Sequence, residues 1–303
     1  MPGQLTLLDA PSLWYRAFHG VPESVTAPDG SPVNLVRGTI DLVARIVRDT
    51  RPARLVACLD LDWRPAFRVQ AIPSYKTHRL TTSGAEAEPD SLAPQVAVLL
   101  EVLDAVGIAT AGVPGYEADD VLGTLSARET GAVDVVTGDR DMFQLVRDEG
   151  PVRVLYTVDK MRPYLPGDVA AKYGIPGTAY AEYAVLRGDP SDGLPGVKGV
   201  GDKTAAALIT RFGTVEGILA ALDAGEQDGF PAGARAKLEA ARDYLAVAPA
   251  VTRAVRDLPV PALDDALPRV PRDPERLVAL ADRWGLDSPL DRLLKAVEVA
   301  HSS

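Results

Sequence analysis

Two kinds of hydrophobic pattern alternate along the first half of the chain. Short, nearly continuous apolar runs predict strands buried on both faces, because parallel sheets covered by helices on both sides show this pattern. These runs lie at residues 4–9, 54–60, 108–111, 133–139 and 152–158. Between them, apolar residues recur every three or four positions, as in amphipathic helices, at about 12–19, 33–49, 94–106, 117–129 and 141–147. The alternation predicts an α/β fold with a mostly parallel central sheet.

The pattern changes after about residue 165, where strand signals end and helical spacing continues. We therefore predict an α/β core over residues 1–165 and a helical region over residues 166–303. The helices expected in the second region lie at 203–211, directly after Thr214, at 235–247 and at 273–284.

Residues 61–93 interrupt the predicted core with prolines and two loop-like clusters. Such composition favours an irregular segment, and we expect part of 70–93 to be mobile. One short helix is predicted near Tyr75–Leu80.

Composition narrows the class of protein. The 303 residues are 47% hydrophobic and 24% charged, which is ordinary for a globular protein with a sizeable core. No apolar run reaches the roughly 18 residues of a membrane span, and no signal peptide is recognised. The single cysteine, Cys58, excludes an internal disulfide and favours a cytoplasmic protein. Three scattered histidines give no spacing for a zinc site.

Acidic residues follow the predicted strands. Asp9, Asp60 and Asp139 end three of them, and six more carboxylates come from nearby motifs: Glu117, Asp119, Asp120, Asp141, Asp189 and Asp192. Because parallel strands end at one edge of a sheet, these residues are expected to converge there. Cations must then neutralise the charge, and all-oxygen ligands select Mg²⁺ or Mn²⁺. Two such ions about 3.5–4 Å apart are a common device for phosphodiester cleavage.

Each acid also has an ordinary explanation. An aspartate after a strand often forms a turn or caps a helix, which explains Asp9 or Asp60 taken singly. Asp119 and Asp120 near a helix start complement the helix dipole. Chance capping explains acids after three strands less well, and Glu117 and Asp120, three residues apart, repel each other without a cation.

The distribution of charge qualifies the net charge of −10, which by itself argues against a nucleic-acid partner. Nine of these negative charges belong to the predicted site. Two segments are locally basic: residues 63–85 carry four cations and no acid, and residues 196–213 carry three cations and one acid. Both are candidate phosphate-binding patches, although a short basic run can also be only solvated surface.

A glycine-rich turn precedes the helix predicted at 203–211. Glycines let backbone amides and a helix N-terminus approach an anion closely. The residues expected to contact phosphate here are Gly196, Lys198, Gly199, Gly201, Lys203 and Thr204. An ordinary helical hairpin with glycine caps is the alternative.

These motifs together resemble the 5′-nuclease family, which includes the N-terminal 5′→3′ exonuclease domain of bacterial DNA polymerase I and the flap endonucleases. The matching segments are 8-LDAPSLWYRAFHG-20, 56-VACLD-60, 75-YKTHR-79, 115-GYEADDVLGTL-125, 138-GDRDMFQLV-146 and 188-GDPSDGLPGVKGVGDKTA-205. Two departures are visible. Ala10 follows Asp9 where the family usually has glycine, and Gly193 follows Asp192 where it usually has asparagine. Neither departure removes a carboxylate.

The resemblance implies a PIN-like nuclease core with two metal sites. Asp9, Asp60, Glu117, Asp119, Asp120 and Asp139 are expected around the first ion, and Asp141, Asp189 and Asp192 toward the second. Residues 61–93 correspond to an arch through which a 5′ single strand passes. Residues 186–220 correspond to a helix-three-turn-helix that grips duplex DNA, often with a bound K⁺.

The implied reaction is hydrolysis of DNA near 5′ ends, at junctions of single strand and duplex. Lys76 and Arg79 are expected to neutralise the cleaved phosphate, Tyr75 to stack on an unpaired base, and Arg68 to contact phosphate. The expected substrates are 5′ flaps, nicked or gapped duplex and 5′ overhangs, with RNA in RNA–DNA hybrids as a further substrate. We expect a free-standing monomer, associated with the nucleoid when on DNA. Two alternatives are a non-catalytic junction-binding relative and a PIN-type ribonuclease.

Overall fold

The computed structural model describes residues 3–81 and 89–302. Its centre is a six-stranded sheet with the order β3-β2-β1-β4-β5-β6. The strands are β1 (Leu5–Asp9), β2 (Arg54–Cys58), β3 (Ala109–Ala111), β4 (Val133–Thr137), β5 (Val152–Tyr156) and β6 (Arg162–Tyr164). Five strands are parallel, and β6 runs antiparallel to β5 at one edge. The predicted mostly parallel α/β sheet is confirmed, whereas β6 was not predicted.

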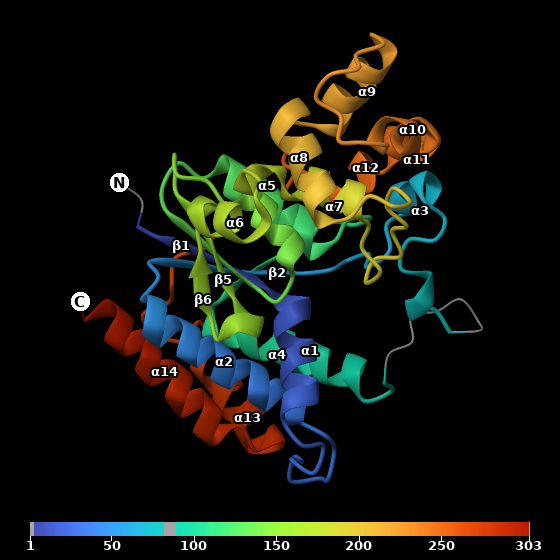
Figure 1. Ribbon diagram of the computed structural model, residues 1–303. Coiled ribbons are helices and arrows are strands. Elements are labelled where there is room, and N and C mark those ends of the chain that lie inside the picture. Colours follow the sequence, from blue (N-terminus) through green and yellow to red (C-terminus); the bar gives the residue numbers. More distant parts are fainter. Residues whose placement is uncertain (1–2, 82–88, 303) are drawn as a thin grey trace.

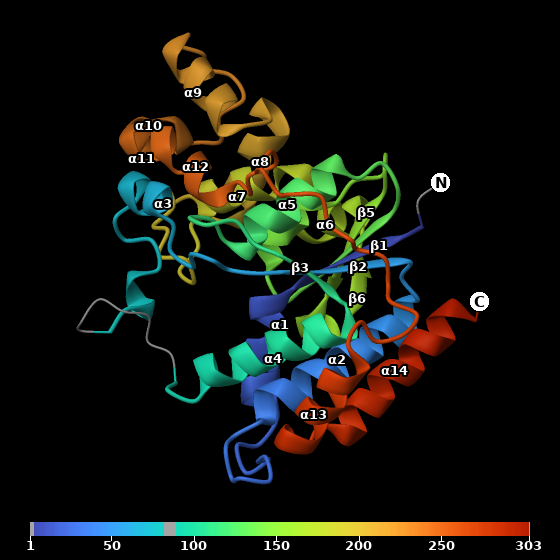
Figure 2. The same ribbon diagram turned by 180° about the vertical axis from the view of Figure 1, so that it is seen from behind.

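Helices cover both faces of this sheet (Figures 1 and 2). One face carries α1 (Ala10–Gly20), α2 (Asn34–Thr50), α4 (Leu92–Val106), α13 (Pro274–Trp284) and α14 (Asp287–His301). The other carries α5 (Ala118–Arg128), α6 (Pro166–Tyr173), α7 (Tyr180–Arg187) and the 3₁₀ helices η2 (Arg140–Leu145) and η4 (Gly177–Ala179). Successive strand residues enter different cores: Leu7 packs on the α5 side and Leu8 on the α2 side. This alternation explains why the strands are apolar throughout.

The remaining helices lie beyond the second face and at the end of the sheet. They are α3 (Ala66–Ala71), η1 (Thr77–Arg79), η3 (Thr157–Asp159), α8 (Asp202–Phe212), α9 (Val215–Asp223), α10 (Ala234–Glu239), α11 (Arg242–Val247) and α12 (Pro249–Thr252). The helix expected at 235–247 is divided into α10 and α11, and the one expected at 141–147 is the 3₁₀ helix η2. The short helix expected near Tyr75–Leu80 is η1. Of the predicted mobile segment, residues 82–88 lie outside the described residues.

Helices α8 and α9 form a hairpin bent by 75°. Thr214 caps α9 as predicted, because its hydroxyl accepts a hydrogen bond of 3.1 Å from the Gly217 amide. Within the described part of the chain, no single helix is long and apolar enough to cross a membrane. Among the described residues, only this bent pair, taken together, reaches that length and composition.

Part of the predicted helical region, residues 166–303, packs onto the α/β core. Helices α13 and α14 return to the core and pack against α4 and α2, on the face opposite the α8–α9 hairpin (Figure 1). The connector before them runs beside β2, where Leu55 donates to the Asp265 carbonyl and Leu267 to the Ala53 carbonyl. The C-terminal residues therefore complete the hydrophobic core of the sheet.

Replacing a core residue of α14 by alanine tests this packing. Leu293 is fully buried between α14 and α2, so Leu293→Ala should lower the free energy of unfolding by about 2–5 kcal/mol through lost burial and a cavity. Val278→Ala on α13 is the matched control, because Val278 is 61% exposed. Urea unfolding measures both variants. Equal stability of the two would show that α14 is not part of the core.

Candidate active site

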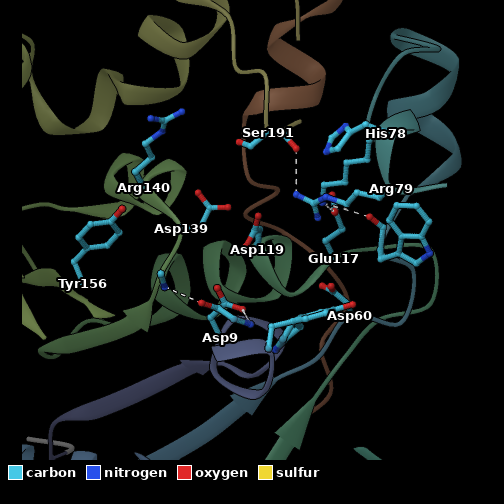
Figure 3. Close-up of a pocket in the computed structure, with 16 residues that line it drawn as sticks. Asp9, Asp60, His78, Arg79, Glu117, Asp119, Asp139, Arg140, Tyr156 and Ser191 are labelled. Carbon is cyan, nitrogen blue, oxygen red and sulfur yellow. Dashed lines mark hydrogen bonds and ion pairs between the residues drawn. The ribbon is translucent and has the colours of Figure 1, made fainter. Parts of the chain in front are cut away.

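A cavity of 820 Å³ opens at the carboxyl ends of the strands, and five acidic side chains line it. Figure 3 shows that they face a common space. They are Asp9, Asp60, Glu117, Asp119 and Asp139. Four basic side chains share the wall: Lys76, His78, Arg79 and Arg140. The prediction that acids from separate strand ends converge is therefore confirmed for these five residues.

Local hydrogen bonds hold three of these carboxylates. Asp9 caps α1 and accepts a 2.5 Å hydrogen bond from the Thr137 hydroxyl at the end of β4. Asp60 accepts a 2.6 Å hydrogen bond from the Ala118 amide at the start of α5. Asp139 caps η2 by accepting from the Asp141 amide at 2.8 Å. Capping and convergence are therefore not alternatives, since the capping residues themselves line the cavity.

Burial and mutual repulsion disfavour the charged forms of Asp9, Asp60 and Asp119. Burial, together with Asp60 and Asp139, raises the pKa of Asp9 to about 7. Burial and the neighbouring Glu117 raise the pKa of Asp60 to about 6. The pKa of Asp119 is raised well above its usual value by burial and by Asp139 and Asp9. A cation bound in the cavity would therefore stabilise the charged forms of these carboxylates.

A second group of acids is joined to this wall. Asp189 pairs with Arg140 at 2.8 Å, and hydrogen bonds from Ser191 and this arginine lower its pKa although burial opposes them. Asp192 lies 3.5 Å from Arg79, and burial raises its pKa. Burial and Asp139 raise the pKa of Asp141, whose Oδ1 is buried without a hydrogen-bond partner among the described residues.

The residues fit a hard divalent cation by their chemistry. The donors are carboxylate oxygens, and the unpartnered Asp141 oxygen lacks a compensating group. Within residues 3–81 and 89–302, however, no three acidic, histidine or cysteine side chains are positioned to hold one ion.

The structure corrects the predictions for Arg68 and Asp120. Arg68 is only 2% exposed and cannot contact DNA phosphate; its guanidinium donates to both oxygens of Asp120 at 2.7 Å. Asp120 is fully buried and also accepts from the Val255 amide, so it faces away from the cavity. The sequence showed a basic residue and an acidic motif, but only the fold reveals that they pair with each other.

Arg68 also holds Glu117, at 2.6 Å, and its Nε donates to the Val251 carbonyl of α12. Tyr75 donates to the same Glu117 carboxylate at 2.7 Å and is 2% exposed. The predicted stacking of Tyr75 on an unpaired base is therefore wrong. Glu117 joins α3, α5 and the segment before η1.

Lys76 and Arg79 both line the cavity, as their predicted roles require. The Lys76 ammonium forms an ion pair with Glu117, and its backbone has a left-handed φ of 50°. Its amide donates to the Asp192 carbonyl at 3.0 Å, and Arg79 donates to the Ser191 carbonyl at 3.2 Å. The basic segment is thus attached to the loop that carries the second group of acids.

Several cavity residues were missed from the sequence. Arg140 lies between Asp139 and Asp141, and His78 lies within the YKTHR motif, so their positions were a usable signal. Tyr15, within the segment 8-LDAPSLWYRAFHG-20, and Tyr156 also line the cavity, and no local pattern indicated Tyr156.

The glycines of the turn before α8 differ from one another. A Cβ on Gly196 would lie 2.5 Å from the Gly188 nitrogen, so packing within the turn requires this glycine. The Gly199 carbonyl accepts from Lys237 at 2.8 Å. A Cβ on Gly201 would meet nothing within 4 Å, which leaves this position open. Lys198 and Lys203 are exposed and Thr204 is half-buried, all outside the cavity.

Comparison with known proteins agrees with this geometry. Residues 4–174 match the family model "5'-3' exonuclease, N-terminal resolvase-like domain", and residues 175–275 match "5'-3' exonuclease, C-terminal SAM fold". A 5'-3' exonuclease of Streptomyces coelicolor is 56% identical over 95% of this chain and 98% of its own length. One from Mycobacterium tuberculosis is 51% identical, over 98% and 99%.

The bacteriophage T5 D15 flap endonuclease, solved in a complex with DNA and metal ions, has a similar fold. Its TM-score is 0.64 at 17% identity, covering 98% of this chain and 99% of that one. The chain belongs to the 5'-3' exonuclease family. It is an enzyme, a nuclease of this class, and the resemblance drawn from its motifs is confirmed.

The raised pKa of Asp9 predicts how stability depends on pH. Between about pH 4 and pH 7 the folded protein keeps a proton on Asp9 that the unfolded chain has already released. The free energy of unfolding therefore falls as the pH rises from about 4 toward about 7. In chelator, Asp9→Asn should therefore melt several degrees above wild type near neutral pH, with the difference shrinking on acidification. Asp282→Asn, at an exposed position of α13, is the control. A pH-independent difference would contradict the raised pKa.

The buried network around Arg68 predicts a loss of both stability and activity. Arg68→Met should destabilise the protein by about 3–5 kcal/mol, because the buried Asp120 loses its ion-pair partner and Glu117 keeps only Lys76. Adding Asp120→Asn should recover part of the stability but not the cleavage rate, since Glu117 still lacks the hydrogen bond from Arg68. Urea unfolding and single-turnover cleavage measure the two effects, with Arg45→Met on the exposed face of α2 as control. Cleavage at the wild-type rate in the double variant would exclude the anchoring role.

Proposed function

We propose that the protein hydrolyses DNA phosphodiesters near 5′ ends, at junctions of single strand and duplex, as an exonuclease and flap endonuclease. The observation that carries the proposal is the single cavity in which five carboxylates face Lys76 and Arg79. The acids can hold cations, and the two basic groups can neutralise a phosphate placed between them. The membership of the chain in the 5'-3' exonuclease family supports this assignment.

Two divalent ions, Mg²⁺ or Mn²⁺, are the proposed cofactors. Asp9, Asp60, Glu117, Asp119 and Asp139 would hold one ion, and Asp141, Asp189 and Asp192 would hold the other. When bound, such ions activate a water nucleophile and stabilise the leaving oxygen. Lys76 would leave its ion pair with Glu117 to meet the phosphate, while Arg79 at the rim of the cavity would orient it.

The proposed partner is DNA with a 5′ flap, a nick, a gap or a 5′ overhang, and RNA–DNA hybrids are a further candidate. The α8–α9 hairpin and its preceding turn would grip the duplex as a helix-three-turn-helix, with K⁺ on the turn. Residues 61–93 would form the arch around the 5′ single strand. The protein would act as a monomer in the cytoplasm, associated with the nucleoid when on DNA.

A labelled 5′-flap duplex and a nicked duplex test the function directly. Wild type should release short 5′ products with Mg²⁺ or Mn²⁺ and none in excess chelator. Asp139→Asn should lower the single-turnover rate by several orders of magnitude while leaving the fold intact. Lys76→Ala should lower it by one or more orders of magnitude, with a smaller loss of duplex affinity.

Asp282→Asn serves again as the control, since it removes an exposed acid far from the cavity. Robust cleavage in chelator, or by Asp139→Asn, would exclude the metal-dependent mechanism. Cleavage of single-stranded RNA in preference to both DNA substrates would favour a ribonuclease instead.

A further inference from the structure

A second cavity of 520 Å³ lies beside the first, between η2, α6, α7 and the start of α8. Four basic side chains and one acid line it: Arg140, Lys172, Arg187, Lys203 and Asp202. Its floor is formed by tyrosines, of which Tyr180 and Tyr183 are 2% and 3% exposed. We call it the bridging cavity, because it joins the nuclease core to the hairpin.

The bridging cavity continues the catalytic cavity at one end. Arg140 lines both, between the Asp139 carboxylate and the loop that begins at Asp189. At the other end, Lys203 lies in the first turn of α8, the first helix of the hairpin. This basic surface therefore lies between the catalytic cavity and the hairpin.

The basic groups are differently engaged. Arg140 and Arg187 pair with Asp189 and Asp202 at 2.8 and 2.6 Å. Among the residues that the structure describes, neither Lys172 nor Lys203 forms an ion pair with a carboxylate. Both lysines are exposed. The cavity thus presents two uncompensated positive charges beside two oriented guanidinium groups.

Tyrosine side chains hold two of these cations, Lys172 directly and Arg187 through Asp202. The Lys172 ammonium lies over the rings of Tyr164 and Tyr173, at 5.2 and 5.4 Å from their centroids. The Tyr183 hydroxyl donates to Asp202 at 2.7 Å, and Asp202 in turn accepts from Arg187. Point charges on a closed aromatic floor suit backbone phosphates, which are bound without reading sequence.

We propose that the bridging cavity binds backbone phosphates of the cleaved strand, in its duplex part between the cleaved bond and the hairpin. The inference rests on the proposed function, which supplies the strand and its direction. Lys172 and Lys203 bind phosphate directly, and Arg187 acts as an oriented second donor. The site keeps the duplex in line with the catalytic cavity without touching the reacting atoms.

Salt-dependent binding tests the contact. The Asp139→Asn background prevents cleavage, and fluorescence anisotropy follows binding to a nicked flap duplex at several salt concentrations. Lys172→Gln and Lys203→Gln should each reduce the log–log salt slope by about 0.9, the value for one lost phosphate contact. Lys295→Gln is the matched control, because Lys295 is an exposed lysine on α14, on the other side of the sheet. A wild-type slope in both cavity variants, with unchanged melting temperatures, would overturn the proposal.

Methylphosphonate substitution identifies the strand. A neutral linkage is moved one nucleotide at a time through the duplex part of the cleaved strand and then through its complement. With Lys172 present, a neutral linkage at one or more positions in the cleaved strand should weaken binding. In the Lys172→Gln variant, a neutral linkage at the same positions should no longer change the affinity. Coupling confined to the complementary strand, or to neither strand, would overturn the proposal.

The outcome is separable from the fate of the proposed function. If the protein with an intact catalytic cavity fails to cleave flap or nicked duplex, the proposed function fails, whatever the binding slopes are. If it cleaves both substrates while Lys172→Gln binds and cleaves like Lys295→Gln, only the bridging cavity is refuted. In the expected case, Lys172→Gln retains its single-turnover rate at saturating protein and loses affinity.

Discussion

Repulsion among carboxylates at one edge of the sheet is the constraint on which the rest of the structure depends. The parallel strands bring Asp9 and Asp139 to the same cavity, and α5 adds Glu117 and Asp119. Burial raises the pKa of Asp9 and Asp119, so the fold holds groups that are least stable when charged and close together. Such an arrangement costs stability without cations and favours binding them.

The Arg68 guanidinium, which is buried and does not line the cavity, offsets part of this loss of stability. It compensates Asp120 and Glu117 at the start of α5, so only part of the EADD motif contributes uncompensated charge to the cavity. Through Glu117 the same network reaches Tyr75 and Lys76. The position of the basic segment is therefore set by an acid that also faces the cavity.

The sequence predicted those features that follow from local pattern. Apolar runs located five of the six strands, and the aspartates that follow β1, β2 and β4 line the cavity as expected. It could not predict long-range pairing: Arg68 and Asp120 are 52 positions apart, and their contact depends on how α3 packs against α5. The packing of α14 against α2 could not be predicted for the same reason, since the sequence of an amphipathic helix does not show which face of a sheet the helix covers.

Two residues that were not predicted, Arg140 and Lys172, lie where two elements meet. Arg140 stands between two aspartates of one motif, yet its guanidinium reaches Asp189 on another loop and lines both cavities. Lys172 belongs to no motif and becomes notable only because α6 ends beside α8. Substrate contacts on a large nucleic acid are spread over such junctions, because a duplex is longer than any single loop or helix N-terminus. The acids of the cavity therefore stand out in the sequence, whereas the basic surface between them and the hairpin is recognised only in the fold.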